Sequence, residues 1–431
     1  MKIIIIGLGS AGFAAALAIK KISRNAEVII IDNKDYDLLH PCGLTFVLEG
    51  RVKSFDKIKH DLNLKSMDIK KIKGKATKID VKNKVVEIDN EKKESYDKLI
   101  IATGSSAFVP DIEGKELAHT VHTIESTTKL KKEIKKGKKA VIVGASAIGL
   151  ETAIALKANG LDVTIVDMLP GVFPKALDED MSNILIDILK EKNIKFVFNE
   201  RIKKIGKNKA YFENENIESD IVVLATGVRP NLDIIKDTPI KATKAGILVD
   251  EKMQTNIKNI YAVGDCVQAR SLITSRPFVA QIATTAFKQG TIAGTNAAGG
   301  DLVYEGLLGT FVSVVGNIEV AATGFNEFFA AQNKIKTISS RVKSTNLPDW
   351  FPGKEEIYVK ILADAETGEI IGGQAIGHGA SSRINVLSTA IKAGFTLQKL
   401  SEVELAYCPA VSQVYDILLV AADLCNRKLT K

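Results

Sequence analysis

Two glycine-rich segments of the chain have the spacing that binds a pyrophosphate. The first glycine of such a motif permits a tight turn, the second lets a pyrophosphate approach the backbone, and the third lets a helix pack closely on a strand. The amides at the start of the helix then face the anion. In the first segment an acidic residue stands twenty residues after the last glycine, where it would accept a hydrogen bond from a ribose hydroxyl. The residues expected at this first dinucleotide site are Gly7, Gly9, Ser10, Ala11, Gly12, Asp32 and Asn33.

The second segment repeats this pattern with one change. Gly144 and Gly149 match the outer glycines, but Ser146 replaces the middle one, which weakens the motif without voiding it. Asp167 follows eighteen residues after Gly149, and no cation stands in positions 168–171. A carboxylate here binds a 2′-hydroxyl and repels a 2′-phosphate, which favours NADH over NADPH. The alternative is a degenerate fold that holds no ligand.

A single cysteine, Cys42, follows the first acidic residue closely, in the segment His40-Pro41-Cys42-Gly43-Leu44-Thr45-Phe46. Pro41 suits the start of a helix, and the helix dipole would lower the pKa of the thiol. We therefore predict a reactive thiolate, against the alternative of a small buried cysteine. Cys266, Cys408 and Cys425 lie far apart without a C-x-x-C pair, which excludes a local zinc site or two-cysteine redox loop. This usage favours a reducing, cytoplasmic compartment.

The elements around these motifs form two similar units. We predict a strand at 2–6, a helix at about 10–22 and a strand at 27–31, which is a βαβ unit. The second unit has a strand at 140–143, a turn at 144–149, a helix at 150–158 and a strand at 163–166. Each unit is followed by a further strand ending in Ala-Thr-Gly, at 99–104 and 221–227, so the repeat extends beyond one motif.

The rest of the chain suggests a third domain. Residues 114–139 read as a crossover, and the segment 260–265 as a return into the first domain. After about residue 323 we predict strands at 356–362 and 369–376 and helices at 383–393 and 412–424. The fold class is therefore α/β, with two Rossmann-like dinucleotide-binding domains and a C-terminal α+β domain. The predicted boundaries are 1–113 with 247–322, 114–246, and 323–431.

The composition excludes several classes of protein. The chain has 431 residues, of which 45% are hydrophobic and 26% charged, and Lys+Arg 59 against Asp+Glu 51 gives a net charge of +8. This is the composition of a compact soluble protein. The lysines are scattered and the aromatic residues sparse, so we expect no nucleic-acid partner. The apolar stretch 3–19 resembles a signal peptide, but its glycines indicate a buried strand and turn, and we expect no membrane segment.

Together these motifs resemble the flavin-dependent pyridine nucleotide-disulfide oxidoreductases, and within them the single-cysteine branch of coenzyme A disulfide reductases and NADH oxidases or peroxidases. The resemblance covers nearly the whole chain. It rests on the glycine segments, Cys42-Gly-Leu, and the segments 96–104, 225–231, 261–265, 288–290 and 405–409.

The resemblance implies FAD in the first domain, NADH in the second, and a homodimer formed by the C-terminal domain. Asp265 would bind the ribityl chain, Glu151 would lie near the nicotinamide, and Tyr407 would reach the active site of the partner subunit. Ala283 and Thr285 belong to a helix start that would face the pyrimidine end of the flavin. Lys20 and Lys21 resemble contacts to the phosphates of coenzyme A. The remaining residues of the implied cofactor set are Ala76, Ala102, Thr103, Gly104, Ile148, Gly227 and Gly264.

The implied reaction has two halves, in which NADH reduces the flavin and the flavin reduces a mixed disulfide at Cys42. Because the loop has one cysteine, the second sulfur must come from outside, as in coenzyme A disulfide, a persulfide or a polysulfide. Ser10 stands where related oxidases and peroxidases usually carry histidine, which argues against peroxide chemistry. Thr45-Phe46 and Trp350-Phe351 replace the usual Pro-Tyr and Tyr-Tyr, which leaves Tyr407 as the phenol that could protonate a departing thiolate.

Two alternatives remain at this point. One is an NADH oxidase that passes electrons to oxygen. The other is a reductase of a small electron-carrier protein such as rubredoxin, which would need no thiol at position 42.

Overall fold

The chain forms two compact units in a computed structural model that describes residues 1–278 and 281–429. Unit 1 comprises Met1–Leu44, Val52–Phe108 and Gly227–Leu307. Unit 2 comprises Thr45–Arg51, Val109–Thr226 and Leu308–Lys431. The mixed α/β architecture predicted from the sequence is confirmed, whereas the three sets of domain boundaries stay a prediction.

Unit 1 is built on a parallel sheet in the order β21-β9-β1-β2-β5. Its strands are β1 (Lys2–Ile6), β2 (Glu27–Asp32), β5 (Ile69–Lys73), β9 (Lys98–Ile101) and β21 (Ile260–Ala262). Ile6 is in register with Ile31 and with Ile101, and Ile101 with Ala262. The segments after these strands therefore emerge at one edge of the sheet, which brings the first glycine motif, Asp32, the Ala102–Gly104 turn and the Gly264 segment together.

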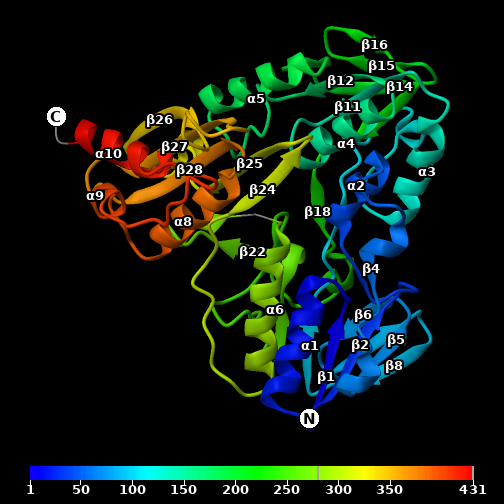
Figure 1. Ribbon diagram of the computed structural model, residues 1–431. Coiled ribbons are helices and arrows are strands. Elements are labelled where there is room, and N and C mark those ends of the chain that lie inside the picture. Colours follow the sequence, from blue (N-terminus) through cyan, green and yellow to red (C-terminus); the bar gives the residue numbers. More distant parts are fainter. Residues whose placement is uncertain (279–280, 430–431) are drawn as a thin grey trace. The chain divides into compact units, whose positions relative to one another are not determined.

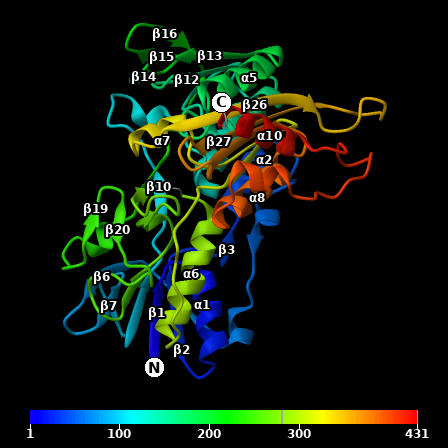
Figure 2. The same ribbon diagram turned by 90° about the vertical axis from the view of Figure 1, so that its left-hand side faces the viewer.

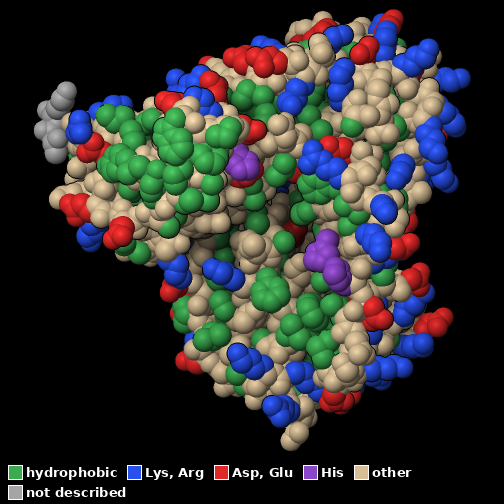
Figure 3. Space-filling model, viewed as in Figure 1, with side chains coloured by type: hydrophobic (Ala, Val, Ile, Leu, Met, Phe, Trp, Pro, Cys, Tyr) green, Lys and Arg blue, Asp and Glu red, His purple; other side chains and the backbone are tan. Residues whose placement is uncertain are grey.

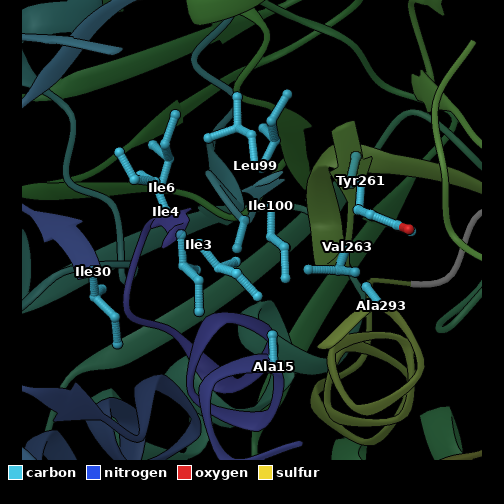
Figure 4. Packing of buried hydrophobic residues seen from close by; sticks show 14 of the residues in the cluster. Ile3, Ile4, Ile6, Ala15, Ile30, Leu99, Ile100, Tyr261, Val263 and Ala293 are labelled. Carbon is cyan, nitrogen blue, oxygen red and sulfur yellow. The ribbon is translucent and has the colours of Figure 1, made fainter. Parts of the chain in front are cut away.

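The core of unit 1 lies between this sheet and two helices, α1 (Ser10–Ile22) and α6 (Ala283–Ala297). The helices lie side by side (Figures 1 and 2), because their facing residues are small. A Cβ on Gly290 would come within 2.1 Å of Ala11 O, and one on Gly294 within 2.3 Å of Ala15 O. In Figure 4 Ile100 of the sheet and Val263, which follows β21, lie toward Ala15 and Ala293. Four consecutive isoleucines are buried because both faces of a parallel sheet are covered.

Smaller sheets complete unit 1. The chain segments before and after the cysteine segment pair as a two-stranded antiparallel ribbon. Unit 1 also contains three further antiparallel or mixed sheets. Their strands are β3 (Leu38–Leu39), β4 (Lys59–His60), β6 (Ala76–Asp80), β7 (Val85–Ile88), β8 (Lys92–Ser95), β10 (Ser105–Ala107), β18 (Val228–Pro230), β19 (Ala242–Thr243), β20 (Gly246–Leu248), β22 (Val267–Arg270) and β23 (Pro277–Phe278).

Unit 2 contains a second parallel sheet in the order β13-β12-β11-β17. Val143 is in register with Val166 and Leu224, so the second glycine motif and Asp167 also share one edge. The strands and helices of this part are β11 (Lys139–Val143), β12 (Asp162–Asp167), β13 (Ile194–Phe198), β17 (Ile221–Leu224), α2 (Leu44–Glu49), α3 (Ile124–Ile134), α4 (Ala147–Ala158) and α5 (Glu179–Glu191). A small sheet adds β14 (Ile202–Gly206), β15 (Lys209–Phe212) and β16 (Asn216–Glu218).

The C-terminal part of unit 2 is an antiparallel sheet with helices, as the sequence predicts. Its order is β24-β25-β28-β27-β26. The elements are β24 (Phe311–Val315), β25 (Ile318–Gly324), β26 (Thr337–Thr345), β27 (Glu356–Asp364), β28 (Ile370–Gly377), α7 (Glu327–Gln332), α8 (Ala380–Lys392), α9 (Leu397–Ser401) and α10 (Ile417–Leu429). Within residues 1–278 and 281–429, no helix combines the length and apolarity that a bilayer crossing needs.

Three helix starts differ from the prediction. One is that of α8, which begins at Ala380 instead of residue 383. Helix α4 begins at Ala147, inside the predicted turn, because Gly149 must already be helical to pack on the turn: a Cβ there would lie 1.9 Å from Gly144 O. Helix α10 begins at Ile417 instead of residue 412. Asp416 sets this start, since its carboxylate accepts a hydrogen bond from Leu418 N–H at 2.9 Å.

Candidate active site

The first glycine motif has the shape that a pyrophosphate requires. Gly7 has φ +104°, and a Cβ on it would lie 2.3 Å from Ala102 O. A Cβ on Gly12 would lie 2.0 Å from Gly7 O. At Gly9, which caps α1, a Cβ would meet no described atom within 4 Å. The outer glycines are therefore needed for packing, and the middle one leaves open space at a helix N-terminus, which fits the diphosphate of FAD.

Asp32 is buried and linked to this motif. Its carboxylate accepts hydrogen bonds from Leu8 N–H at 2.7 Å and from Lys34 N–H at 2.8 Å, and Lys34 Nζ lies 3.1 Å from Oδ2. Each carboxylate oxygen can accept more than one bond, so the group can hold the loop and still accept from a ribose. Asn33 is exposed beside it. Ala76 begins β6, two residues after Gly74, whose N–H donates to Asp32 O.

Long-range hydrogen bonds fix the other predicted flavin residues. Thr103 Oγ1 donates to Asn231 O at 2.9 Å, and Asn231 Nδ2 donates to Thr103 O at 2.9 Å. Ser105 Oγ donates to Asp265 Oδ2 at 2.8 Å. Sequence reasoning did not include Asn231 and Ser105 in the site, although Asn231 lies in one of the segments that carried the resemblance.

The start of α6 is supported in the same way. Gln289, which is 1% exposed, accepts a hydrogen bond from Gly264 N–H at 2.8 Å. Tyr304 lies beside it, and burial raises the pKa of Tyr304 to about 12, with hydrogen bonds to Gln289 and Thr285 opposing the rise. These contacts join the helix start at Ala283 and Thr285 to the segment of Gly264 and Asp265. Gln289 and Tyr304 are further supporting residues that sequence reasoning missed.

The second glycine motif repeats the geometry of the first. Gly144 has φ +118°, and a Cβ on it would lie 2.2 Å from Ala225 O. Ser146 caps α4 and is exposed, and its side chain makes no capping hydrogen bond within the described chain. Asp167 is buried and accepts from Ala145 N–H at 2.7 Å and Leu169 N–H at 2.8 Å. The acidic residue and the open helix start fit NADH, with Ile148 in the first turn of α4. Gly227, which has φ +89°, belongs to unit 1.

The four cysteines differ sharply in accessibility. Cys42 and Cys408 are exposed, whereas Cys266 and Cys425 are buried. Burial raises the pKa of Cys266, and it raises the pKa of Cys425 to about 11. The buried thiols are therefore poor nucleophiles, which leaves Cys42 and Cys408 as candidates.

Cys42 lies in a single 3₁₀ turn, η1 (Pro41–Gly43), which α2 follows. This differs from the predicted helix beginning at Pro41, and the reason is local: Gly43 N–H closes the turn on His40 O at 2.9 Å. A 3₁₀ turn and a six-residue helix supply a smaller dipole than a full helix, so the predicted effect of the dipole on the thiol is weaker.

Glu151 is a half-buried carboxyl group near the start of the second nucleotide fold. It lies on α4 and accepts hydrogen bonds from Thr45 Oγ1 at 3.0 Å and Ser313 Oγ at 2.7 Å. Burial raises the pKa of Glu151, the two hydroxyls oppose this, and Glu49 adds to it. We call Glu151, Thr45 and Ser313 the Glu151 clamp. Sequence reasoning included Glu151 but not its two partners.

Two other predicted contacts have different environments. Lys20 Nζ donates to Ala26 O at 2.8 Å and pairs with Asp68 at 2.7 Å, so its ammonium group closes the end of α1 and is not a free phosphate ligand. Lys21 is exposed. Tyr407 is 43% exposed beside Cys408, in the segment before α10.

Comparison with known proteins identifies the family of the chain. Residues 1–290 match the family model of the pyridine nucleotide-disulphide oxidoreductases, and residues 310–417 match the dimerisation domain of the same family. The chain is 37% identical to an NADH oxidase of Methanocaldococcus jannaschii over 100% of both chains. It is 30% identical to a CoA-dependent NAD(P)H sulfur oxidoreductase of Pyrococcus furiosus, covering 98% of both chains. It also resembles the solved structure of an NAD-dependent persulfide reductase from A. fulgidus, with a TM-score of 0.95 and 32% identity over 99% of this chain and 83% of that one.

The chain belongs to the pyridine nucleotide-disulphide oxidoreductases. It is an FAD-dependent enzyme that uses a nicotinamide dinucleotide, which confirms the predicted family and cofactors. It also carries the dimerisation domain of the family.

Proposed function

We propose that this protein uses NADH to reduce a low-molecular-weight disulfide or persulfide, with Cys42 as its nucleophile. The observation that carries this proposal is an exposed cysteine in a tight turn directly before α2, in a chain that has two dinucleotide motifs. The names of its relatives, which include a sulfur oxidoreductase and a persulfide reductase, support a sulfur acceptor.

Different residues of the chain bind the cofactors and attack the substrate in this reaction. The Gly7–Gly12 and Gly144–Gly149 turns hold the two pyrophosphates, and Asp32 and Asp167 hold the riboses. FAD, when bound, supplies the relay that converts a hydride from NADH into electrons for sulfur. The Cys42 thiolate attacks one sulfur of a disulfide such as coenzyme A disulfide, which forms a mixed disulfide and releases one thiolate. Two electrons and two protons then cleave that mixed disulfide, so one NADH and one proton convert one disulfide into two thiols.

The proposal extends to assembly and compartment. We infer a homodimer in which Tyr407 serves the partner subunit and can protonate the departing thiolate. Trp350, Val411 and Val414 are 71%, 68% and 72% exposed, although they are large and apolar. In Figure 3 hydrophobic side chains gather over the C-terminal part of unit 2, where Figure 1 draws α9 and α10. The small number of cysteines, four without a C-x-x-C pair, supports a reducing cytoplasm.

A comparison of electron acceptors tests this function. The FAD-loaded enzyme is supplied with NADH under anaerobic conditions and given coenzyme A disulfide, polysulfide or oxidised rubredoxin, with oxygen tested in parallel. We expect the highest kcat/KM with a sulfur acceptor, and a loss of at least about a thousandfold in Cys42→Ser. Rubredoxin as the preferred acceptor, with undiminished turnover in Cys42→Ser, would contradict the proposal.

The second candidate function is an NADH oxidase, because the relative from Methanocaldococcus jannaschii bears that name. Against this candidate, Ser10 stands at the start of α1. Oxidases and peroxidases that this chain resembles usually carry histidine at that position. Stoichiometric oxygen consumption that survives Cys42→Ser would favour the oxidase.

A further inference from the structure

Thr45 occupies a position at which the resemblance leads one to expect proline. It is 2% exposed, and its hydroxyl donates to Glu151 Oε2 at 3.0 Å. Proline could make no such bond, because it has neither a hydroxyl nor an N–H. The departure from the usual Pro-Tyr pair therefore adds a specific interaction to α2 instead of only removing a rigid residue.

The Glu151 clamp joins three elements that are distant in the sequence. Thr45 belongs to α2, Glu151 to α4 and Ser313 to β24, and Ser313 is 3% exposed. Each carboxylate oxygen of Glu151 accepts one hydrogen bond, Oε2 from Thr45 Oγ1 at 3.0 Å and Oε1 from Ser313 Oγ at 2.7 Å. Hydrogen bonds to a charged acceptor are among the stronger ones, so Thr45 is held firmly as long as Glu151 keeps its position.

The other end of α2 is held by different partners. Lys131 Nζ donates to Val47 O at 3.2 Å, and Asn159 Nδ2 donates to Leu48 O at 3.0 Å. These bonds satisfy carbonyl groups at the helix C-terminus. The clamp acts at the opposite end, in the first turn, and Cys42 lies only three residues before Thr45.

Glu151 is also close in sequence to the second nucleotide motif. It is the fifth residue of α4, whose first turn contains Ile148 and Gly149 and whose N-cap is Ser146. A pyrophosphate bound at this helix start would order the first turn, and Glu151 follows directly on that turn. The Glu151 carboxylate therefore links α4, which begins at the nucleotide loop, to α2, which follows Cys42 in the sequence.

We propose that Thr45 is a positioning residue that couples occupancy of the Gly144–Gly149 loop to the order of the Cys42 segment through Glu151. This inference rests on the proposed function, because it takes the loop to bind NADH. It predicts that the nucleotide reduces the mobility of residues 42–50 as well as that of its own loop.

Hydrogen–deuterium exchange of the FAD-loaded enzyme, with and without saturating NAD⁺, tests the coupling. In the wild type we expect NAD⁺ to slow exchange in the peptides covering 144–151 and 42–50. In Thr45→Val, which keeps the shape but removes the hydroxyl, exchange of 42–50 should be roughly tenfold faster. Protection by NAD⁺ should then persist at 144–151 and disappear at 42–50.

Thr152→Val is the matched control. Thr152 is fully buried next to Glu151 on the same helix, and its hydroxyl has no hydrogen-bond partner among the described residues. The same isosteric change there should leave both protections as in the wild type. Ser313→Ala, which spares the Thr45 bond, should retain protection of 42–50.

The outcomes separate this inference from the proposed function. Protection of 144–151 without protection of 42–50 in the wild type would overturn the coupling and leave the NADH site standing. Protection of 42–50 that persists in Thr45→Val would likewise overturn it. Failure of NAD⁺ to protect 144–151 in the wild type would overturn both the NADH site and the coupling.

Discussion

At the scale of single residues, Glu151 combines burial with two hydroxyl donors. Burial raises the pKa of its carboxyl group, the hydroxyls of Ser313 and Thr45 oppose the rise, and Glu49 adds to it. Because the pKa in the folded state lies above the unfolded value, the ionised form is disfavoured by folding. The contribution of this group to stability is therefore complete below the unfolded pKa, and it is lost as the pH rises through the folded pKa.

Glu151→Gln should change the pH dependence of stability accordingly. Glutamine carries no charge at any pH, so the melting temperature of the variant relative to the wild type should be higher at about pH 8 than at roughly pH 4. Calorimetry at both pH values measures this difference. Glu191→Gln, at the exposed end of α5, should show no such trend. An equal difference between Glu151→Gln and the wild type at both pH values would argue against a raised pKa of Glu151.

Asp167 governs the choice of nicotinamide cofactor in this account. Its carboxylate accepts hydrogen bonds from the backbone amides of Ala145, in the glycine loop, and of Leu169. Asp167→Asn removes the negative charge and keeps one acceptor oxygen. A negative charge repels a 2′-phosphate, so we expect the ratio of kcat/KM for NADPH to that for NADH to rise by about tenfold or more. Steady-state kinetics with both cofactors checks this. Asp162→Asn, at the exposed start of β12, should leave the ratio unchanged.

At the scale of elements, apolar runs and the spacing of the glycines predicted most strands and helices of the two nucleotide folds. The first βαβ unit has the predicted bounds to within one residue, because buried isoleucines and the glycine spacing act over a few residues. The hairpin of β24 and β25 was not predicted, although Gly316-Asn317 between two apolar runs is a turn signal. Contacts such as Ser313 to Glu151 and Ser105 to Asp265 join residues 162 and 160 positions apart, which local patterns cannot reveal.

An ion cluster around the buried Lys360 connects elements within unit 2. Lys360 Nζ on β27 lies 3.0 Å from Asp178, 2.9 Å from Asp180 and 2.8 Å from Glu327, and its side chain is 5% exposed. Burial alone would lower the pKa of Lys360, but the three carboxylates raise it above its ordinary value. Asp178 also accepts from Gln374 Nε2 at 2.7 Å. The start of α5 is thus fixed to the C-terminal sheet.

Lys360→Met should destabilise the protein by about 3 kcal/mol, because it leaves a buried carboxylate without its cation. Thermal unfolding measures the loss. Lys336→Met removes a lysine whose pair with Glu366, at 3.7 Å, is exposed, and it should cost less than about 1 kcal/mol. Equal effects of the two substitutions would show that the Lys360 cluster contributes no more than a surface pair.

At the scale of the whole molecule, the apolar surface of the C-terminal domain predicts association. Val414 is 72% exposed, and Val414→Asp should weaken the dimer by introducing a charge that the interface must desolvate. Light scattering after size-exclusion chromatography should give a monomer for this variant at a concentration that keeps the wild type dimeric. Leu117→Asp, at a residue 49% exposed in the second nucleotide fold, should stay dimeric. A dimeric Val414→Asp would remove this surface from the interface.

The central claim concerns one sulfur atom, and a stoichiometric titration tests it most directly. The FAD-loaded enzyme is treated with coenzyme A disulfide, freed of excess reagent and titrated anaerobically with NADH. The wild type should take up about two equivalents per flavin, one for the flavin and one for the mixed disulfide at Cys42, since each accepts two electrons. Cys42→Ser should take up about one, and Cys408→Ser about two. One equivalent in the wild type, or loss of the second equivalent in Cys408→Ser alone, would contradict the account.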